Sequence, residues 1–183
     1  MKILLHNCCG PCSVYPVAVL SAQGHEITGY FFRSNIHPYT EMQKREEALD
    51  LFAGIAGFTV IRENGYDLEG FLRMAAFREA DRCRFCYHAR LSAAARIARH
   101  GRFDAFSTTL LYSRFQKHEL IRETGEAVAA ECGVPFFYED FRKGWKEGIE
   151  ESKRLKLYRQ QYCGCIYSER ERFFRPEREP GKK

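Results

Sequence analysis

The stretch KILLHNCCGPCS, residues 2–13, joins a short apolar run to three cysteines, and it decides how the rest of the chain is interpreted. The run KILLH has the length and composition of a buried strand. The segment after the cysteines, YPVAVLSAQG at 15–24, has the apolar character of a short helix that ends at Gly24. A strand followed by a helix begins a βαβ unit, so we expect the thiols at the carboxyl end of the first strand.

The same alternation continues to about residue 140. We expect strands at 2–6, 26–32, 58–63, 103–110 and 134–141, and further helices at 40–57, 67–80, 86–101 and 117–133. Strands separated by helical segments form parallel sheets with helices on both faces. The pattern therefore predicts an α/β fold, a doubly wound parallel sheet of about five strands. In such sheets ligands bind beyond the carboxyl ends of the strands, where the cysteine cluster is expected.

The 183 residues are enough for one domain. We predict an α/β core over 1–140, a helical, cysteine-containing extension over 141–175 and a frayed tail over 176–183. No apolar stretch approaches the ~20 residues of a membrane span, and the N-terminus has no signal-peptide cleavage site. These features predict a cytoplasmic protein with no membrane partner. The formal charge of +5 is compatible with a polyanionic partner without establishing one.

Eight cysteines are more than a cytoplasmic chain needs for packing, and they indicate metal binding or redox chemistry. Seven fall into three groups: Cys8, Cys9 and Cys12; Cys83 and Cys86; Cys163 and Cys165. The eighth, Cys132, is expected to be a small buried core residue.

The spacing within each group indicates what its thiols can do. Cys83 and Cys86 have the C-x-x-C spacing of a half-site for zinc or an iron-sulfur cluster. Cys163 and Cys165 could ligate a metal or form an easily reduced disulfide. Adjacent side chains on an extended backbone point to opposite sides, so the neighbouring thiols at 8 and 9 are expected to reach two different iron atoms.

Cys12, at the start of the next helix, is expected to fold back toward Cys8 and Cys9. Seven thiols exceed the four that one zinc ion or one cubane cluster requires, which favours a cluster plus a second reactive centre. A closed structural zinc site with spare cysteines remains an alternative.

Four motifs in order along the chain carry a family resemblance: HNCCGPCS at 6–13, CRFCYHARL at 83–91, STTLLYSRFQKHELI at 107–121 and YCGCIYSERER at 162–172. Together they resemble the epoxyqueuosine reductase family called QueH over roughly residues 3–173. The resemblance implies a fold similar to the adenine nucleotide alpha-hydrolase class. Thiols stand here where a nucleotide-binding relative carries the phosphate-binding SGGxDS loop, so ATP use is not expected.

The resemblance also implies an oxidoreductase that reduces the epoxide of epoxyqueuosine to an alkene, at the wobble position of tRNA. It implies a 4Fe-4S cluster, no cobalamin and an electron donor of unidentified nature. The cluster ligands carried over are Cys8, Cys9, Cys83 and Cys86. Cys163 and Cys165 become a redox-active pair or ligands of a second, mononuclear iron, and Cys12 gains a metal-facing role.

The reaction needs a proton donor, and contact with tRNA needs aromatic and basic side chains. By proximity to the motifs, the candidate donors are Tyr112, His118, Tyr162 and Tyr167, although for each of them a structural hydrogen-bonding role is favoured over that of the acid. Candidate tRNA contacts lie in YSRFQKH at 112–118 and in 142–175, which contains Trp145, Tyr158, Tyr167, Phe173 and Phe174. An amphipathic helix packed on the sheet would explain the second segment equally well. His6 and His37 are expected to be core residues or partners of the ligands.

Two other functions remain open at this point. One is an iron-sulfur tRNA sulfur-transferase or ATP-pyrophosphatase relative built on the same fold. The other is a non-catalytic, zinc-stapled RNA-binding module.

Overall fold

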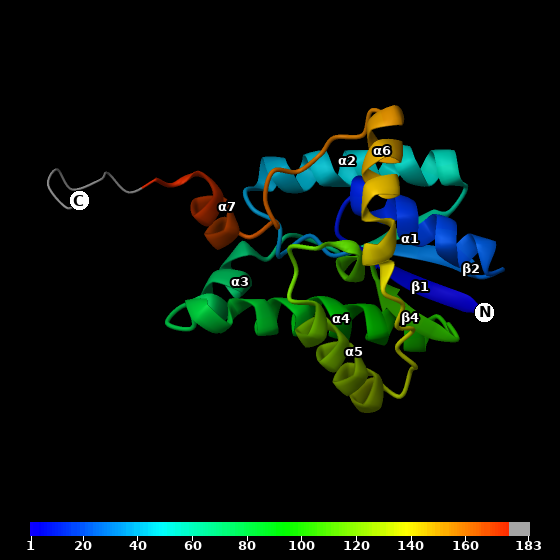
Figure 1. Ribbon diagram of the computed structural model, residues 1–183. Coiled ribbons are helices and arrows are strands. Elements are labelled where there is room, and N and C mark those ends of the chain that lie inside the picture. Colours follow the sequence, from blue (N-terminus) through cyan, green and yellow to red (C-terminus); the bar gives the residue numbers. More distant parts are fainter. Residues whose placement is uncertain (176–183) are drawn as a thin grey trace, which may run out of the picture.

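Four parallel strands form the centre of the molecule (Figure 1). The computed structural model describes residues 1–175, and the tail predicted at 176–183 lies outside the described residues. The strands are β1 (Lys2–Asn7), β2 (Glu26–Phe31), β3 (Thr59–Arg62) and β4 (Ala105–Thr108), in the order β3-β2-β1-β4. β1 is central, and its residues Ile3, Leu4 and Leu5 are fully buried because helices cover both of its faces.

The helices form one layer on each face of the sheet, which confirms the predicted doubly wound α/β architecture. α1 (Gly10–Ala22), α2 (Tyr39–Ala56) and α6 (Trp145–Arg154) lie on one face, and α4 (Arg82–His100) and α5 (His118–Cys132) lie on the other (Figure 1). α3 (Leu68–Ala75) and α7 (Ile166–Phe173) lie beyond the carboxyl ends of the strands, where Phe71 and Cys165 share a small apolar cluster.

The predicted fifth strand is much shorter than expected. Residues 134–141 contact the sheet through an isolated bridge between Phe106 and Phe136. Only two hydrogen bonds form it, from the Phe106 N–H to the Pro135 carbonyl (3.0 Å) and from the Phe137 N–H to the Phe106 carbonyl (2.8 Å). Pro135 has no N–H to donate, and the chain leaves the sheet for the short 3-10 helix Phe141–Gly144. The described part of the chain therefore has a four-stranded sheet.

The junction between β1 and α1 fixes the first cysteine motif in place. α1 begins at Gly10, earlier than the expected residue 15, because the Cys9 sulfur caps it by accepting the Cys12 N–H at 3.4 Å. A Cβ atom at Gly10 would lie 2.4 Å from the Ala48 carbonyl oxygen, so only glycine allows α1 to approach α2 this closely. The cysteines at 8, 9 and 12 therefore occupy a rigid, densely packed turn.

The C-terminal extension returns to the same edge of the sheet. α6 packs on α1, and a loop of residues 155–165 then runs along the carboxyl edge to α7 (Figure 1). This 155–165 loop carries Cys163 and Cys165. Among residues 1–175, no helix combines the length and the apolar character that crossing a lipid bilayer requires.

Candidate active site at the carboxyl edge of the sheet

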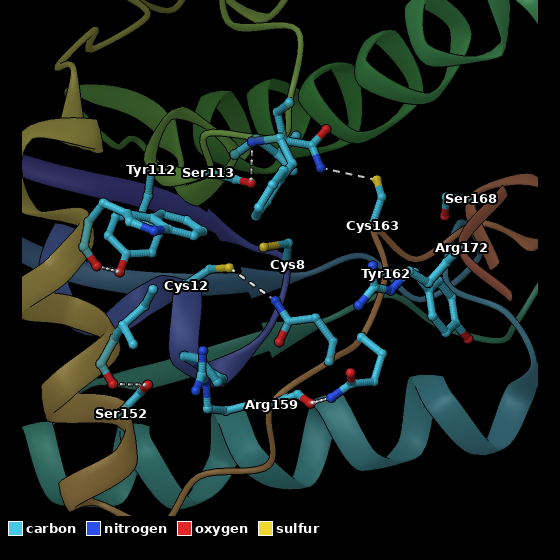
Figure 2. A pocket seen from close by; sticks show the side chains of 18 of the residues that line it. Cys8, Cys12, Tyr112, Ser113, Ser152, Arg159, Tyr162, Cys163, Ser168 and Arg172 are labelled. Carbon is cyan, nitrogen blue, oxygen red and sulfur yellow. Dashed lines mark hydrogen bonds between the residues drawn. The ribbon is translucent and has the colours of Figure 1, made fainter.

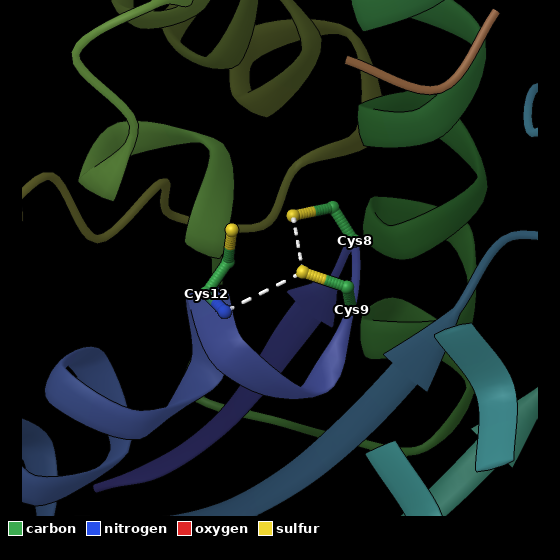
Figure 3. Close-up of side chains that lie close together, drawn as sticks. All are labelled: Cys8, Cys9 and Cys12. Carbon is green, nitrogen blue, oxygen red and sulfur yellow. Dashed lines mark hydrogen bonds between the residues drawn. The ribbon is translucent and has the colours of Figure 1, made fainter. Parts of the chain in front are cut away.

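Cys8, Cys9 and Cys12 form a compact N-terminal thiol cluster (Figure 3). All three are buried, and their sulfur atoms lie within 4.8 Å of one another. The sulfurs of Cys8 and Cys9 are 3.9 Å apart, so the expectation that they point to opposite sides is wrong. The reason is the turn into α1, where the Cys9 sulfur bends inward to accept the Cys12 N–H. The three thiols could hold one metal ion together, and Cys12 folds back as expected.

Hydrogen bonding concentrates negative charge on one sulfur of this cluster. Hydrogen bonds from the Cys12 and Cys9 thiols hold the pKa of Cys8 well below its ordinary value, and the Thr109 hydroxyl adds a hydrogen bond of 3.4 Å. The pKa of Cys9 is raised mainly by burial, and that of Cys12 mainly by its hydrogen bond to Cys8. The cluster therefore favours a thiolate at Cys8, the form in which cysteine binds metals.

A small pocket brings thiols from all three cysteine motifs together. Cys8 from the β1–α1 turn, the C-x-x-C pair at the start of α4 and the C-x-C pair of the 155–165 loop all line it; these residues are Cys8, Cys83, Cys86, Cys163 and Cys165. Cys9 and Cys12 do not line this pocket, but their sulfurs adjoin that of Cys8. Because thiolates select iron-sulfur clusters or zinc, this donor set suits either of these groups.

Two polar side chains donate hydrogen bonds to the sulfur of Cys86. Arg90 Nε donates to Cys86 Sγ at 3.3 Å, and Asn35 Nδ2 donates to the same atom at 3.2 Å. Arg90 also contacts His6 Nε2 at 3.3 Å, and burial followed by the Arg90 charge lowers the pKa of His6 to about 3. The imidazole is therefore neutral at physiological pH, and the buried guanidinium is the cation that offsets thiolate charge here.

The 155–165 loop is fixed by a buried ion pair on α2. The Arg45 side chain is 1% exposed and pairs with Glu41 at 2.7 Å. Its guanidinium also donates to the carbonyls of Cys163 (2.8 Å) and Tyr162 (3.0 Å). Arg45 therefore fixes the backbone of the C-x-C motif from the side of α2.

His37 and Gln116 fix the same loop from two other directions. The His37 N–H donates to the Gly164 carbonyl at 2.8 Å, and its Nδ1 accepts the Ile166 N–H at 3.2 Å. Gln116 Nε2 donates to the Cys163 sulfur at 3.0 Å. Gly164 has φ +144°, a conformation that side chains disfavour, so the C-x-C motif depends on glycine at its centre.

A larger cavity of about 650 Å³ opens beside the thiols (Figure 2). It shares Cys8 and Cys163 with the small pocket and adds Cys12. Figure 2 shows the sulfurs of Cys8 and Cys12 between Tyr112 on one side and Arg172 on the other. The volume is that of a site for a small organic molecule, so a ligand of nucleoside size could reach the sulfurs.

The four candidate proton donors fall into two pairs. Tyr112 and Tyr162 line the large cavity, but the Tyr112 hydroxyl donates to the Trp145 carbonyl at 3.0 Å and the Tyr162 hydroxyl donates to the His37 carbonyl. Burial raises the pKa of both tyrosines. His118 hydrogen-bonds to the Tyr138 hydroxyl, Tyr167 packs on Phe71, and neither lines the two cavities.

The aromatic residues expected to contact tRNA are also divided. Trp145 lines the large cavity, whereas Tyr158 donates to Glu41 and lies outside it. Phe173 and Phe174 are exposed and do not line it. Cys132 is partly buried, packs on the main core and lines neither cavity.

Sequence reasoning missed several residues that position the thiols, although a signal was present for two of them. Arg45 lies at helical spacing with the buried residues Met42, Leu49 and Phe52, so a charge interrupts an apolar face. Arg90 interrupts the buried face of α4 in the same way. Gln160 Nε2 donates to the Cys12 sulfur at 3.3 Å. This contact and those of Asn35 and Gln116 depend on the tertiary fold, and no local sequence pattern predicts them.

The comparisons with known proteins agree with this geometry. The family model described as "Epoxyqueuosine reductase QueH" matches residues 3–171. A protein from Dehalococcoides mccartyi with the same name is 41% identical over 176 residues, covering 96% of each chain. One from Histophilus somni is 35% identical, covering 93% of this chain and 73% of its own.

Among solved structures, a predicted subunit of tRNA methyltransferase from Methanocaldococcus jannaschii superimposes with a TM-score of 0.58 at 12% identity, covering 84% of this chain and 76% of that one. This likeness concerns the fold alone, and it agrees with the expected α/β class. The extent and identity of the family matches show that the chain belongs to the epoxyqueuosine reductase QueH family, a family of oxidoreductases.

Proposed function

We propose that this protein reduces epoxyqueuosine to queuosine at the wobble position of tRNA, with an iron-sulfur cluster and without cobalamin. The single observation that carries the proposal is the meeting of thiols from three distant motifs beside a cavity large enough for a nucleoside. Family membership supplies the reaction class. The expectation of no cobalamin is what the resemblance of the motifs implies.

The thiols present suit an iron-sulfur group. We assign Cys8, Cys9, Cys83 and Cys86 as the ligands of a 4Fe-4S cluster, as the resemblance implies. Cys12, Cys163 and Cys165 are then left to ligate a second iron, or the last two serve as a redox-active pair. Bound iron would supply single electrons and a Lewis acid for the epoxide oxygen.

The reaction balance defines what the protein must provide. Removing the oxygen breaks both carbon–oxygen bonds, forms a carbon–carbon double bond and releases water, which consumes two electrons and two protons. We expect the two electrons to come from an external electron donor, whose identity the sequence does not reveal. Arg90 lies beside Cys86 and offsets the charge that accumulates on the thiolates. The arginine, glutamine and histidine contacts to the 155–165 loop keep Cys163 at the cavity wall.

The start of α1 argues against the ATP-using alternative. A phosphate-binding loop offers free backbone N–H groups at a helix N-terminus. Here Pro11 has no N–H, and the Cys12 N–H already donates to the Cys9 sulfur. The first turn of α1 therefore presents sulfur where a nucleotide-binding relative presents amide donors.

The test is a turnover assay with anaerobically prepared, iron-loaded protein, a chemical reductant and tRNA that bears epoxyqueuosine. Nucleosides are then released and analysed by mass spectrometry. The proposal expects loss of one oxygen from the modified nucleoside, dependent on iron and unaffected by added cobalamin. Iron-loaded protein that binds the tRNA and never yields the alkene would contradict it, as would protein that retains zinc alone.

A further inference from the structure

The large cavity has two chemically different ends, separated by its sulfurs (Figure 2). Aromatic residues line the end formed by the 112–116 segment and the start of α6. Arg172 of α7 lines the opposite end, and Arg159 of the 155–165 loop lines the wall below Cys12 (Figure 2). In Figure 2, Tyr112 marks the first end and Arg172 the second, with Cys8 and Cys12 between them.

The aromatic end is a prepared stacking surface. The Trp145 ring lies 5.1 Å from that of Tyr112 at 33°, and 5.6 Å from that of Phe115 at 78°. Tyr112 is buried and its hydroxyl donates to the Trp145 carbonyl, so Tyr112 fixes the position of Trp145. Phe115 is 85% exposed, so this large apolar ring remains available to a ligand. Such platforms bind unstacked nucleobases.

Two arginines of the cavity wall have no carboxylate partner. Arg159 and Arg172 are exposed and line the cavity, and neither makes an ion pair with any residue in the range 1–175. Glu171 also lines the cavity, but its carboxylate is paired with Arg82. Free guanidinium groups bind phosphate oxygens with two parallel hydrogen bonds. Charge complementarity therefore favours anionic groups of the ligand beside these two arginines.

Between the two ends, one buried polar atom has no partner. Gln160 Nε2 donates to the Cys12 sulfur at 3.3 Å, while Gln160 Oε1 is buried without a hydrogen bond. Buried acceptors almost always have a donor, so an occupant of the cavity is expected to supply one. Because the amide is tied to Cys12, that donor would lie next to the thiols.

We propose that this cavity binds one RNA nucleotide in a fixed orientation. Its base stacks on Trp145 and Phe115, and the phosphates on its two sides bind Arg172 and Arg159. The substituent on the base then lies beside Cys12, where Gln160 Oε1 accepts a hydrogen bond from it. This inference rests on the proposed function and deepens it, because it states in which orientation the wobble nucleotide binds and which part of the cavity contacts which chemical group.

The test uses an anticodon stem-loop RNA with fluorescent 2-aminopurine at the wobble position, titrated with anaerobic protein at several salt concentrations. Wild-type protein is expected to bind saturably, with a change in fluorescence. Phe115→Ala, a change at an exposed position, should weaken binding by roughly 5- to 150-fold, the range of one stacked base, and should leave the salt dependence unaltered. Trp145→Phe keeps a ring at the platform and should give a smaller loss.

The arginine variants should have the complementary effect. Arg159→Gln and Arg172→Gln should each reduce the slope of log K against log salt by about 0.7, the value for one phosphate contact on a single strand, with the fluorescence change retained. Arg154→Gln is the matched control, because Arg154 is paired with Glu151 and lies outside the cavity. Phe77→Ala is the aromatic control, since Phe77 is 99% exposed and does not line the cavity.

Three outcomes would overturn the inference: no saturable binding by wild-type protein, Phe115→Ala binding as wild type, or arginine variants with unchanged salt slopes. Its failure is distinguishable from that of the proposed function. If binding follows the expected pattern and no epoxide is reduced, the orientation holds and the reductase assignment fails. If wild-type protein reduces the epoxide while these variants bind and react as wild type does, the orientation is wrong and the reductase assignment stands.

Discussion

Two of the three groups of thiols that meet at the carboxyl edge are held there by different means. Cys8, Cys9 and Cys12 follow the central strand directly and cap the helix that packs on it, so the fold itself positions them. Cys163 and Cys165 lie in the 155–165 loop, which hydrogen bonds from α2, the His37 segment and Gln116 hold in place. The position of the first group therefore depends on the sheet. The position of the second depends on a few side-chain contacts that single substitutions can remove.

The largest effect should follow from removing a sulfur of the loop. We expect Cys163→Ser and Cys165→Ser to abolish turnover while changing the free energy of unfolding of the metal-free protein by no more than about 1 kcal/mol, since serine is close in size. Turnover is measured by the nucleoside assay and stability by urea denaturation. Cys132→Ser, at a cysteine outside both cavities, should retain activity. Unfolded loop variants would instead support a structural zinc site.

The next effect should come from the ion pair that holds the loop. Arg45→Gln leaves Glu41 buried without its partner and removes the donors to two loop carbonyls. Breaking a buried pair in this way costs about 3–5 kcal/mol of unfolding free energy. The double variant Glu41→Gln/Arg45→Gln should recover part of that loss, because no buried charge remains unpaired. A single variant as stable as wild type would show that the loop does not depend on this pair.

Acid should loosen the loop through His37. Burial lowers the pKa of His37 to about 4, with a smaller contribution from Arg90, against an unfolded value of about 6.5. The unfolded chain therefore binds more protons between these values, so the stabilisation is complete above pH 6.5 and is lost as the pH falls toward 4. Protonation would also place a hydrogen on Nδ1, which now accepts the Ile166 N–H.

The expected slope is at most about 1.4 kcal/mol per pH unit, or about 3 kcal/mol over the whole interval. It is measured by urea denaturation of metal-free protein between pH 7 and pH 4. The imidazole faces the Ser34 carbonyl, the rings of Phe71 and Tyr66, and the more distant Arg90 charge. His37→Gln should flatten the profile, whereas His88→Gln, at an exposed residue, should not. Equal slopes in wild type and His37→Gln would refute this role.

The smallest effect should follow from a methyl group at Gly164. An alanine there must adopt φ +144°, with its Cβ 3.1 Å from an Arg45 nitrogen. The strain should cost about 1–3 kcal/mol of unfolding free energy. Gly54→Ala is the matched control in the last turn of α2, where the added methyl meets open space and should stabilise by up to about 1 kcal/mol. If Gly164→Ala leaves the free energy of unfolding unchanged, the loop is less constrained than its contacts indicate.

The same contrast explains how much of the molecule the sequence could predict. Hydrophobic periodicity and the order of strands and helices identified β1–β4 and the position of the first cysteine motif, because these depend on local pattern. The prediction of a fifth strand was wrong because Pro135 and the 3-10 helix that follows limit this segment to one bridge. The close approach of the Cys8 and Cys9 sulfurs also escaped prediction, since it depends on Cys9 capping α1.

The loop contacts could be predicted least. Those of Arg45 and Gln116 join residues 118 and 47 positions apart in the sequence, and no local pattern encodes such distances. The division of the seven clustered thiols between a cluster and a second centre remains a prediction, because the same pocket admits more than one set of ligands.

The central claim is that three distant cysteine motifs hold iron together, and the most direct test is the iron content of anaerobically loaded protein with one thiol removed from each motif. Cys8→Ser, Cys83→Ser and Cys165→Ser should each lower bound iron and the visible absorption of thiolate-bound iron, while Cys132→Ser should match wild type. Full iron loading in a variant of any one motif would contradict the account, because that motif would then lie outside the metal centre.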